Sequence, residues 1–416
     1  MSAPEVAGTA AAVSRPVRAY PRSWLAALLL AAGAVFAGWF GPIQILLPAQ
    51  AANLAEPGGK EALLALVTGI GAVVSLVANP VWGVISDRLS GTVPRRRTVL
   101  VAGVLIGSAG LGVLAVAGDA AGMIAGWSLV QIGLNGPLAA LIAMIADRVP
   151  AERRGLVGAL FGVAQTAGVV LGTATAVVAG EGALGYVVLA VAVPLLCIAI
   201  VLMPERRLGE NTDAVPARQS LGAVLRALRP TASFTWAWIV RLLLNLANAL
   251  VLTYLYYFLL DMVKVDDPGT WVLVLTGVNV LVTAVVASVG GIWSDRIAKR
   301  RVFALAAILT VAVGVLLIAF VPTLPVLMAT TVLLGIGWGL YMAVDIAIIT
   351  EVLPSDRSTA SMLGLANIAA ALPQVLAPAL AAPIVISLGG YSVLYIVTVV
   401  IALLALPALA RLRTVA

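Results

Sequence analysis

Long apolar runs separated by short polar segments dominate the pattern along this chain. A hydrocarbon core of about 30 Å and a helix rise of about 1.5 Å per residue require roughly 20 apolar residues for each crossing. The runs that meet this length lie at 23–48, 62–85, 98–118, 122–145, 156–179 and 183–203, and then at 233–260, 270–293, 302–321, 325–350, 359–386 and 391–410. The pattern therefore predicts an all-α polytopic membrane protein with 12 transmembrane helices.

The longest polar stretch, 204–232, divides these runs into two groups of six. It predicts a tail at 1–22, a first six-helix half at 23–203, a linker at 204–232, a second half at 233–410 and a tail at 411–416. The run that follows the basic N-terminus is too long for a cleavable signal peptide and is expected to be the first span.

Basic residues are distributed unevenly between the two sides that this topology creates. If the N-terminus is cytoplasmic, 22 of the 25 Lys and Arg residues fall in cytoplasmic segments, whereas Lys60 and Lys264 are periplasmic. Cytoplasmic loops of membrane proteins carry this excess of positive charge. We therefore expect a multi-pass protein of the plasma (inner) membrane with both termini in the cytoplasm.

Composition excludes several classes of function. The chain is 62% hydrophobic and 10% charged, and its net charge of +7 is spread over many loops, which disfavours a nucleic-acid partner. It has no His and a single Cys197, so we expect no metal site, disulfide framework or other cofactor. The sequence also lacks a phosphate-binding loop of the Gly-Lys-Ser/Thr type. An enzyme that hydrolyses ATP is therefore not expected, and energy for any transport would come from a gradient.

Two polar loops repeat each other. Gly83-Val-Ile-Ser-Asp87-Arg88 follows the second span, and Gly291-Ile-Trp-Ser-Asp295-Arg296 follows the eighth. A second match at a spacing of 204 residues pairs the segment 147–153 with the segment 351–357. This repetition predicts two halves related by parallel duplication, with a solute site between them at mid-membrane.

The segment from Gly83 to Arg97 resembles the signature loop of the major facilitator superfamily, and its echo extends the resemblance over nearly the whole chain. The resemblance implies a monomeric carrier that works by alternating access. It also implies that the two loops gate the cytoplasmic side, through Gly83, Asp87, Arg88, Gly291, Asp295 and Arg296. The alternative is that these are ordinary solvated turn residues, whose basic members only reflect the excess of positive charge in cytoplasmic loops.

Two further segments are similar to the sucrose and glycoside carrier branch of that superfamily. They are Gly364 to Gln374 in span eleven and Asn135-Gly136-Pro137 in span four. Sodium-coupled members of the branch use acidic residues in span two, where the predicted span here offers only Ser75 and Asn79. Sodium coupling is therefore disfavoured.

Only Arg241 and Asp345 are charged residues well inside the predicted spans. Inserting either charged side chain into lipid would cost about 2.5–3.5 kcal/mol of free energy. Each should therefore face protein or a water-filled cavity. Two interpretations compete. Either the residues form a fixed ion pair that holds the second half together, or Asp345 takes up a proton while Arg241 switches between it and the solute.

Polar and aromatic residues recur at helical spacing in several spans, so that they share one face. Such faces favour a cavity in which rings stack on a sugar and amides bind its hydroxyls, although hydrogen bonds between packed helices would explain them equally well. The candidates for the substrate cavity are Trp127, Gln131, Asn135, Asn245, Asn248, Trp338, Tyr341, Asn367 and Gln374.

We therefore expect a secondary active transporter, coupled to protons, that moves a sugar, glycoside or similar small polar solute. Its partners would be that solute, a proton and the lipid bilayer. Efflux of a hydrophobic metabolite or drug is the alternative, and a membrane sensor or assembly protein without transport is a third. The third is disfavoured because such a protein needs no gating loop in each repeat.

The resemblance predicts that Asp87→Asn slows transport, because it removes the charge that would hold the cytoplasmic side closed. Turnover of the variant in reconstituted vesicles, compared with that of the wild type, measures this. Unchanged turnover would favour the view that the loop is only a solvated turn.

Overall fold

The computed structural model describes residues 20–89, 95–203, 231–297, 299–352 and 359–412. All regular structure within these residues is helical. Twelve segments are long and apolar enough to cross a membrane, which confirms the predicted fold class and the number of spans. Most of the predicted N-terminal tail and linker, and the last four residues, lie outside the described residues.

The helices of the first half are α1 (Arg22–Gly41), η1 (Pro42–Leu46), α2 (Leu47–Leu54), α3 (Lys60–Arg88), α4 (Arg95–Val116), α5 (Ala120–Arg148), α6 (Ala151–Ala179) and α7 (Ala183–Leu202). Those of the second half are α9 (Ala232–Thr253), α10 (Leu255–Phe258), η2 (Leu259–Val263), α11 (Pro268–Ile297), α12 (Arg300–Phe320), α13 (Leu324–Glu351), α14 (Thr359–Ser387), α15 (Gly390–Leu403) and α16 (Ala405–Ala410). The segments η1 and η2 are single π-helical turns that follow the first long helix of each half.

Polar residues just before three helices define where those helices begin. Asp119 accepts a hydrogen bond from the Gly122 N–H at 2.7 Å, and Thr231 accepts one from Phe234 at 3.2 Å. Asp267 accepts one from the Thr270 N–H at 2.9 Å, and hydrogen bonds from Thr270 lower the pKa of this carboxyl below its ordinary value. Each cap satisfies a backbone donor that the first turn leaves unpaired.

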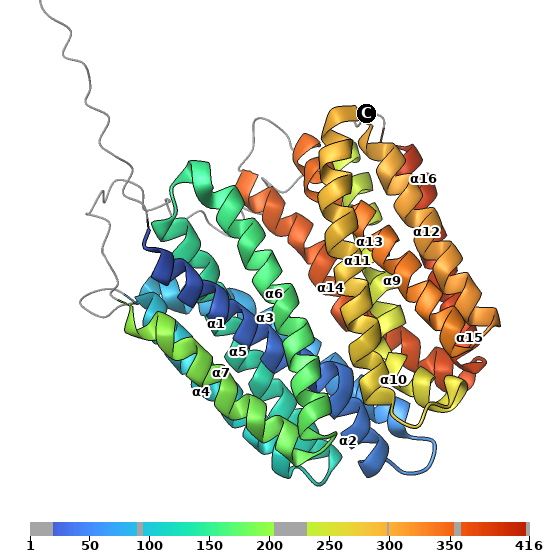
Figure 1. The fold of residues 1–416 in the computed structure, drawn as a ribbon, viewed down its shortest axis with the longest axis horizontal. Helices are drawn as coiled ribbons and strands as arrows, with labels where there is room; N and C mark the ends of the chain where they lie inside the picture. Colours follow the sequence, from blue (N-terminus) through green and yellow to red (C-terminus); the bar gives the residue numbers. More distant parts are fainter. Residues whose placement is uncertain (1–19, 90–94, 204–230, 298, 353–358, 413–416) are drawn as a thin grey trace, which may run out of the picture.

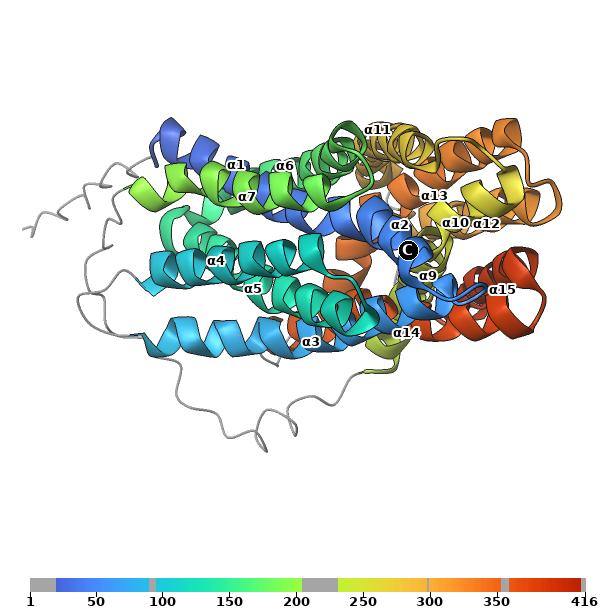
Figure 2. The same cartoon turned by 90° about the horizontal axis from the view of Figure 1, so that it is seen from below.

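The two halves form two bundles that stand side by side, blue to green and yellow to red in Figures 1 and 2. Equivalent helices pack in equivalent pairs: α4 with α5 and α12 with α13, α1 with α6 and α9 with α14, α4 with α7 and α12 with α15. We call the side of the membrane that carries Arg22 and Ala410 the terminal face, and the opposite side the distal face. Between the halves, α3 packs on α14 and α6 on α11.

Ion pairs at the terminal face repeat with the same 204-residue spacing. Arg96 Nε lies 3.1 Å from Asp147 Oδ2, and Arg300 Nη1 lies 2.8 Å from Glu351 Oε2. Each pair joins the third and fourth spans of its half. The duplication visible in the sequence is thus reproduced in the contacts of individual side chains.

Glycine allows close helix packing between α4 and α5. An added Cβ at Gly133 would collide with the backbone of Gly107 and would lie 2.7 Å from the carbonyl oxygen of Gly103. Backbone cannot move aside as a flexible side chain can. The α4–α5 contact therefore depends on these small residues, as close helix packing in membranes generally does.

Gly133→Ala should destabilise the protein by about 1–3 kcal/mol, because the new methyl group overpacks this contact. Gly112→Ala is the matched control on α4, since a Cβ there meets nothing within 4 Å. The control should be neutral or stabilising by up to about 1 kcal/mol. Thermal unfolding in detergent micelles compares the two variants, and equal midpoints would contradict the packing argument.

Candidate functional site

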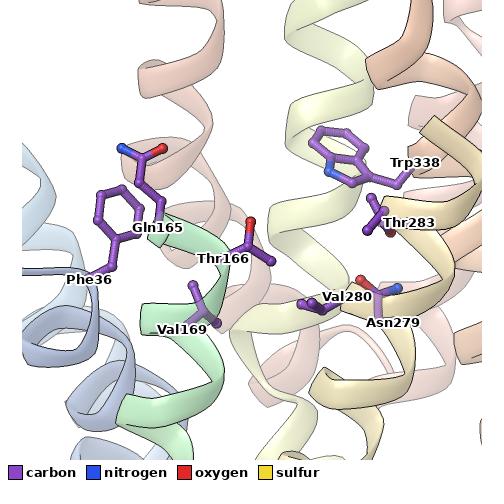
Figure 3. A pocket seen from close by; sticks show the side chains of 9 residues that line it. Phe36, Gln165, Thr166, Val169, Asn279, Val280, Thr283 and Trp338 are labelled. Atoms are coloured by element: carbon purple, nitrogen blue, oxygen red, sulfur yellow. The ribbon is translucent and has the colours of Figure 1, made fainter. Parts of the chain in front are cut away.

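A cavity of about 260 Å³ lies between the two halves. Figure 3 shows side chains of α6 and α11 facing each other across it, with Phe36 of α1 and Trp338 of α13 at either side. Its lining residues are Phe36, Gln165, Thr166, Val169, Asn279, Val280, Thr283, Ala284 and Trp338. Both halves therefore line this cavity.

The polar groups of the cavity are neutral. Thr166 donates to the Gly162 carbonyl at 2.9 Å, and Thr283 donates to the Gly335 carbonyl at 3.3 Å. Asn279 donates through Nδ2 to the Thr331 carbonyl at 3.4 Å, a long bond that leaves its amide oxygen free to accept. With Gln165, these groups offer donors and acceptors from both walls and no charge.

A chain of contacts leads from the cavity to the buried charges. Trp338 packs against Tyr341 with ring centroids 5.5 Å apart. The Tyr341 hydroxyl donates to Asp345 Oδ1 at 2.5 Å, and Arg241 Nη1 lies 2.8 Å from Asp345 Oδ2. The Arg241 Nε is buried without a hydrogen-bond partner among the described residues. Trp338, Tyr341, Asp345 and Arg241 thus form one continuous series of contacts from the cavity to the ion pair.

The Arg241–Asp345 contact belongs to both interpretations drawn from the sequence. A fixed pair requires it permanently, and a proton switch requires it in one state of the cycle. The side chains are 14% and 9% exposed, so the carboxylate depends on Arg241 and Tyr341 for its compensation.

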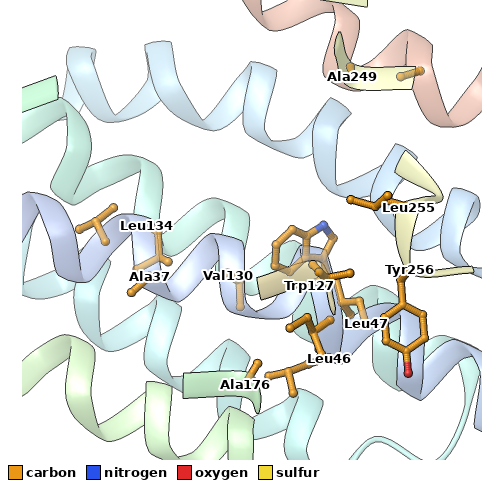
Figure 4. Packing of buried hydrophobic residues seen from close by; sticks show 14 of the residues in the cluster. Ala37, Leu46, Leu47, Trp127, Val130, Leu134, Ala176, Ala249, Leu255 and Tyr256 are labelled. Carbon is orange, nitrogen blue, oxygen red and sulfur yellow. The ribbon is translucent and has the colours of Figure 1, made fainter. Parts of the chain in front are cut away.

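The candidate residues of span four lie in α5, away from the cavity. Asn135 is buried, accepts from Asn79 Nδ2 at 3.3 Å and donates to Ser75 Oγ at 2.9 Å, so it joins α5 to α3. It also donates to the Gln131 carbonyl at 2.7 Å. Trp127 is buried beside Leu46 and Leu47 (Figure 4). Their contacts are those of helix packing.

The remaining candidates are scattered. Asn245 donates to the Arg241 carbonyl one turn away at 2.8 Å, and Asn248 is half-buried on the same helix. Asn367 and Gln374 of α14 are exposed. Of the nine candidates for the substrate cavity, Trp338 is the one that lines the cavity described above.

The repeated loops lie at the terminal face, where α3 and α11 end. The side chains of Asp87, Arg88 and Asp295 lie outside the described residues, and Arg296 is exposed. A Cβ added at Gly83 or Gly291 would meet nothing within 4 Å. The neighbouring half is therefore not packed against either glycine in this conformation.

Sequence reasoning missed the polar pair that defines the cavity, Gln165 and Asn279. Both are amides within apolar spans, and each is followed at i+1 or i+4 by a threonine, Thr166 or Thr283. This repeated amide–threonine pairing on spans five and eight was the available signal. It is weak because single threonines are frequent in spans and bond to their own helix.

Arg241→Met should cost about 3–5 kcal/mol of stability, because it leaves the buried Asp345 carboxylate uncompensated. Adding Asp345→Leu should recover most of that loss, since an apolar pair can replace a buried ion pair. Thermal unfolding of both single variants and the double variant forms a double-mutant cycle. Additive effects would show that the two residues do not interact.

Comparison with known proteins agrees with this architecture. The family model of the Major Facilitator Superfamily matches residues 25–273 and 267–416. No curated protein matches the chain in sequence. Solved structures similar to this one belong to transporters at 13–17% identity, so they are similar in fold alone.

One similar structure is a bacterial homologue of the human lysosomal transporter Spinster, in an inward-facing and occupied conformation, at 15% identity with a TM-score of 0.74; the match covers 96% of this chain and 98% of that chain. A structure of the nucleoside transporter NupG has 13% identity and a TM-score of 0.74, over 94% and 100% of the chains. The peptide transporter POT in complex with sulfate has 17% identity and a TM-score of 0.73, over 96% and 97%.

The family match extends over both halves, the twelve spans repeat their contacts, and the cavity lies where the halves meet. This chain is a multi-pass membrane protein that belongs to the major facilitator superfamily, a transporter and not an enzyme.

Proposed function

We propose that this transporter moves a neutral, hydroxyl-rich solute such as a sugar or glycoside, and that a proton is coupled to the movement. The observation that carries the proposal is the cavity lining, in which amides and hydroxyls from both halves stand beside two aromatic rings. Amides bind hydroxyl groups, and a ring such as that of Trp338 stacks on the apolar face of a pyranose. An ionic solute would find no countercharge among the lining residues.

The contribution of both halves supports alternating access. A solute bound between Gln165 on α6 and Asn279 on α11 loses one set of hydrogen bonds when the halves separate. Binding energy is therefore largest when both walls are near it. This difference in affinity between states allows a solute to shift the conformational equilibrium.

The orientation follows from charge. The terminal face carries most of the basic residues. We therefore place this face and both termini on the cytoplasmic side of the inner membrane. The halves are joined by hydrogen bonds at the distal face, whereas the glycines of the repeated loops are unpacked at the terminal face. These contacts support an inward-facing conformation.

Asp345 is the proposed coupling group within the membrane. Its carboxylate is paired with Arg241 and reaches the cavity through Tyr341 and Trp338. When a solute displaces Trp338, the Tyr341 hydroxyl can leave Asp345. A buried carboxylate that loses a hydrogen-bond donor is less stabilised as an anion, so proton uptake becomes more favourable.

A second candidate is efflux of a hydrophobic metabolite or drug. The apolar part of the cavity lining, formed by Phe36, Val169, Val280 and Ala284, favours it. A nucleoside combines a sugar with an apolar base and would suit both parts of the lining. The similar fold of a nucleoside transporter makes that class a useful member of a test panel.

Uptake into proteoliposomes should show accumulation of a sugar, glycoside or nucleoside that depends on an imposed pH gradient. Asp345→Asn should abolish the dependence on the gradient. Asn279→Ala should raise the KM about tenfold, because it removes a hydrogen bond to the solute worth roughly 1–1.5 kcal/mol. The matched control is Asn53→Ala, an exposed asparagine of α2.

Accumulation in Asp345→Asn that still follows the gradient would remove Asp345 from the coupling mechanism. If lipophilic compounds move and no polar solute does, the efflux candidate replaces the proposal. An equal effect of Asn279→Ala and Asn53→Ala would remove the cavity from the substrate path.

A further inference from the structure

A polar junction between the two halves lies beyond the cavity, toward the distal face. Gln44 Oε1 accepts hydrogen bonds from Thr173 Oγ1 of α6 at 2.7 Å and from Thr276 Oγ1 of α11 at 3.3 Å. On α6, Thr173 lies four residues past Val169, which lines the cavity. On α11, Thr276 lies four residues from the lining residue Val280, in the same direction (Figure 3). Residues four apart share a helix face, so both walls of the cavity lead to Gln44.

Helix α1 leads to the same point. Phe36 lines the cavity and stacks on Phe40, with ring centroids 5.9 Å apart. Gln44 follows Phe40 by four residues and lies in the π-helical turn η1. Turns of this kind are rare and often occur at functional positions. Three elements therefore converge on Gln44, which forms the distal end of the cavity.

Glycine packing fixes the position of Gln44 within the first half. A Cβ added at Gly41 would lie 2.7 Å from the Gly172 carbonyl oxygen, and one added at Gly172 would lie 2.5 Å from the Ala37 carbonyl oxygen. The backbones of α1 and α6 are thus in contact just before Gln44 and Thr173. This contact keeps the Gln44 carbonyl beside Thr173 when the halves move relative to each other.

The other end of the Gln44 amide is free. A primary amide accepts through its oxygen and donates two hydrogen bonds through its nitrogen. The oxygen is occupied by the two threonine hydroxyls, whereas Nε2 has no hydrogen-bond partner among the described residues. The side chain is half-buried, and this nitrogen is open to water. A ligand in the cavity that displaces the water must offer an acceptor or leave the donor unpaired.

Gln50 shows how a glutamine with a purely structural role is bonded. Its Nε2 donates to the Leu114 carbonyl at 2.9 Å and to the Ala117 carbonyl at 3.1 Å. Its Oε1 accepts from the Tyr186 hydroxyl at 2.8 Å. Both ends of this amide are used inside the first half, whereas Gln44 uses one end only.

We propose that Gln44 is a specificity-determining residue, whose amide nitrogen donates a hydrogen bond to an oxygen at the distal end of the bound solute. The inference rests on the proposed function, transport of a neutral, hydroxyl-rich solute. A hydroxyl, ring or glycosidic oxygen accepts this bond, and a hydrocarbon does not. Gln44 thus adds selection for a polar group at the end of the solute that points away from the cytoplasm.

The test measures uptake into proteoliposomes for wild type, Gln44→Met and the matched control Gln50→Met. The probes are glucose, methyl glucoside, sucrose and uridine, which are neutral and carry several hydroxyl groups. Gln44→Met should raise the KM for the transported probe about three- to tenfold, the loss expected for one hydrogen bond. Its thermal midpoint should stay close to that of wild type, because Thr173 keeps its bond to the Val169 carbonyl at 2.8 Å.

The control should behave in the opposite way. Gln50→Met should lower the thermal midpoint, because it leaves two carbonyls and a tyrosine hydroxyl without their partner, and it should leave the KM unchanged. Gln44→Glu should raise the KM at least as much as Gln44→Met, because an ionised carboxylate has no hydrogen to donate.

A wild-type KM in Gln44→Met or in Gln44→Glu, measured with a probe that wild type transports, would overturn the inference and leave the proposed function intact. An equal rise of the KM in Gln50→Met would do the same. If wild type transports none of the probes, the proposed function fails and the inference fails with it. The wild-type measurement therefore separates the two failures.

Thiol labelling gives a second readout that needs no solute. Gln44→Cys in a Cys197→Ala background should react with a charged methanethiosulfonate reagent added from the cytoplasmic side, because the amide end is open to water. Ala31→Cys is the matched control on α1, since Ala31 is fully buried and should not react. If Gln44→Cys reacts no faster than Ala31→Cys, Gln44 does not face the cavity and the inference is overturned.

Discussion

Hydrocarbon offers no hydrogen-bond partner, so helices satisfy the backbone within the membrane, and a polar side chain there is costly unless it meets a partner or water. In a chain that is 10% charged, the few polar side chains therefore report where helices meet or where water enters. Asn135 finds Ser75 and Asn79 on the neighbouring helix, and Asp345 finds Arg241 and Tyr341. Gln165 and Asn279 instead face a cavity between the halves. The same constraint thus separates residues that hold a half together from residues that are open to a solute.

Contacts within each half differ in kind from contacts between the halves. Within each half, tight glycine packing and the repeated pairs Arg96–Asp147 and Arg300–Glu351 keep the bundle rigid. Between the halves, the distal face is joined by tyrosine hydroxyls, carboxylates and Lys60, polar groups that water can hydrogen-bond when the halves separate. Rigid bundles and an exchangeable interface are what a rocking mechanism requires.

Length, hydropathy and the repeated loops were enough to predict the twelve spans and the family, because each span alone must be long and apolar enough to cross the bilayer. The cavity could not be predicted in the same way. The spans are apolar on nearly every side, so helical spacing identified Trp127, Gln131 and Asn135 as one face without showing that this face packs on α3. Gln165 and Asn279 meet only through the arrangement of α6 and α11. Glu61 lies one residue before the predicted start of span two, so its place beside Tyr391 became visible only in three dimensions.

Alternating access requires that the cavity between α6 and α11 is reached from one side of the membrane at a time. Thr166→Cys in a Cys197→Ala background places a single thiol in that cavity. Its rate of reaction with a membrane-impermeant thiol reagent can be measured at pH 5.5 in inside-out and in right-side-out vesicles. An inward-facing cavity should be labelled fast from the cytoplasmic side and much more slowly from the periplasmic side. Equal rates from both sides, or faster labelling from the periplasm, would contradict it.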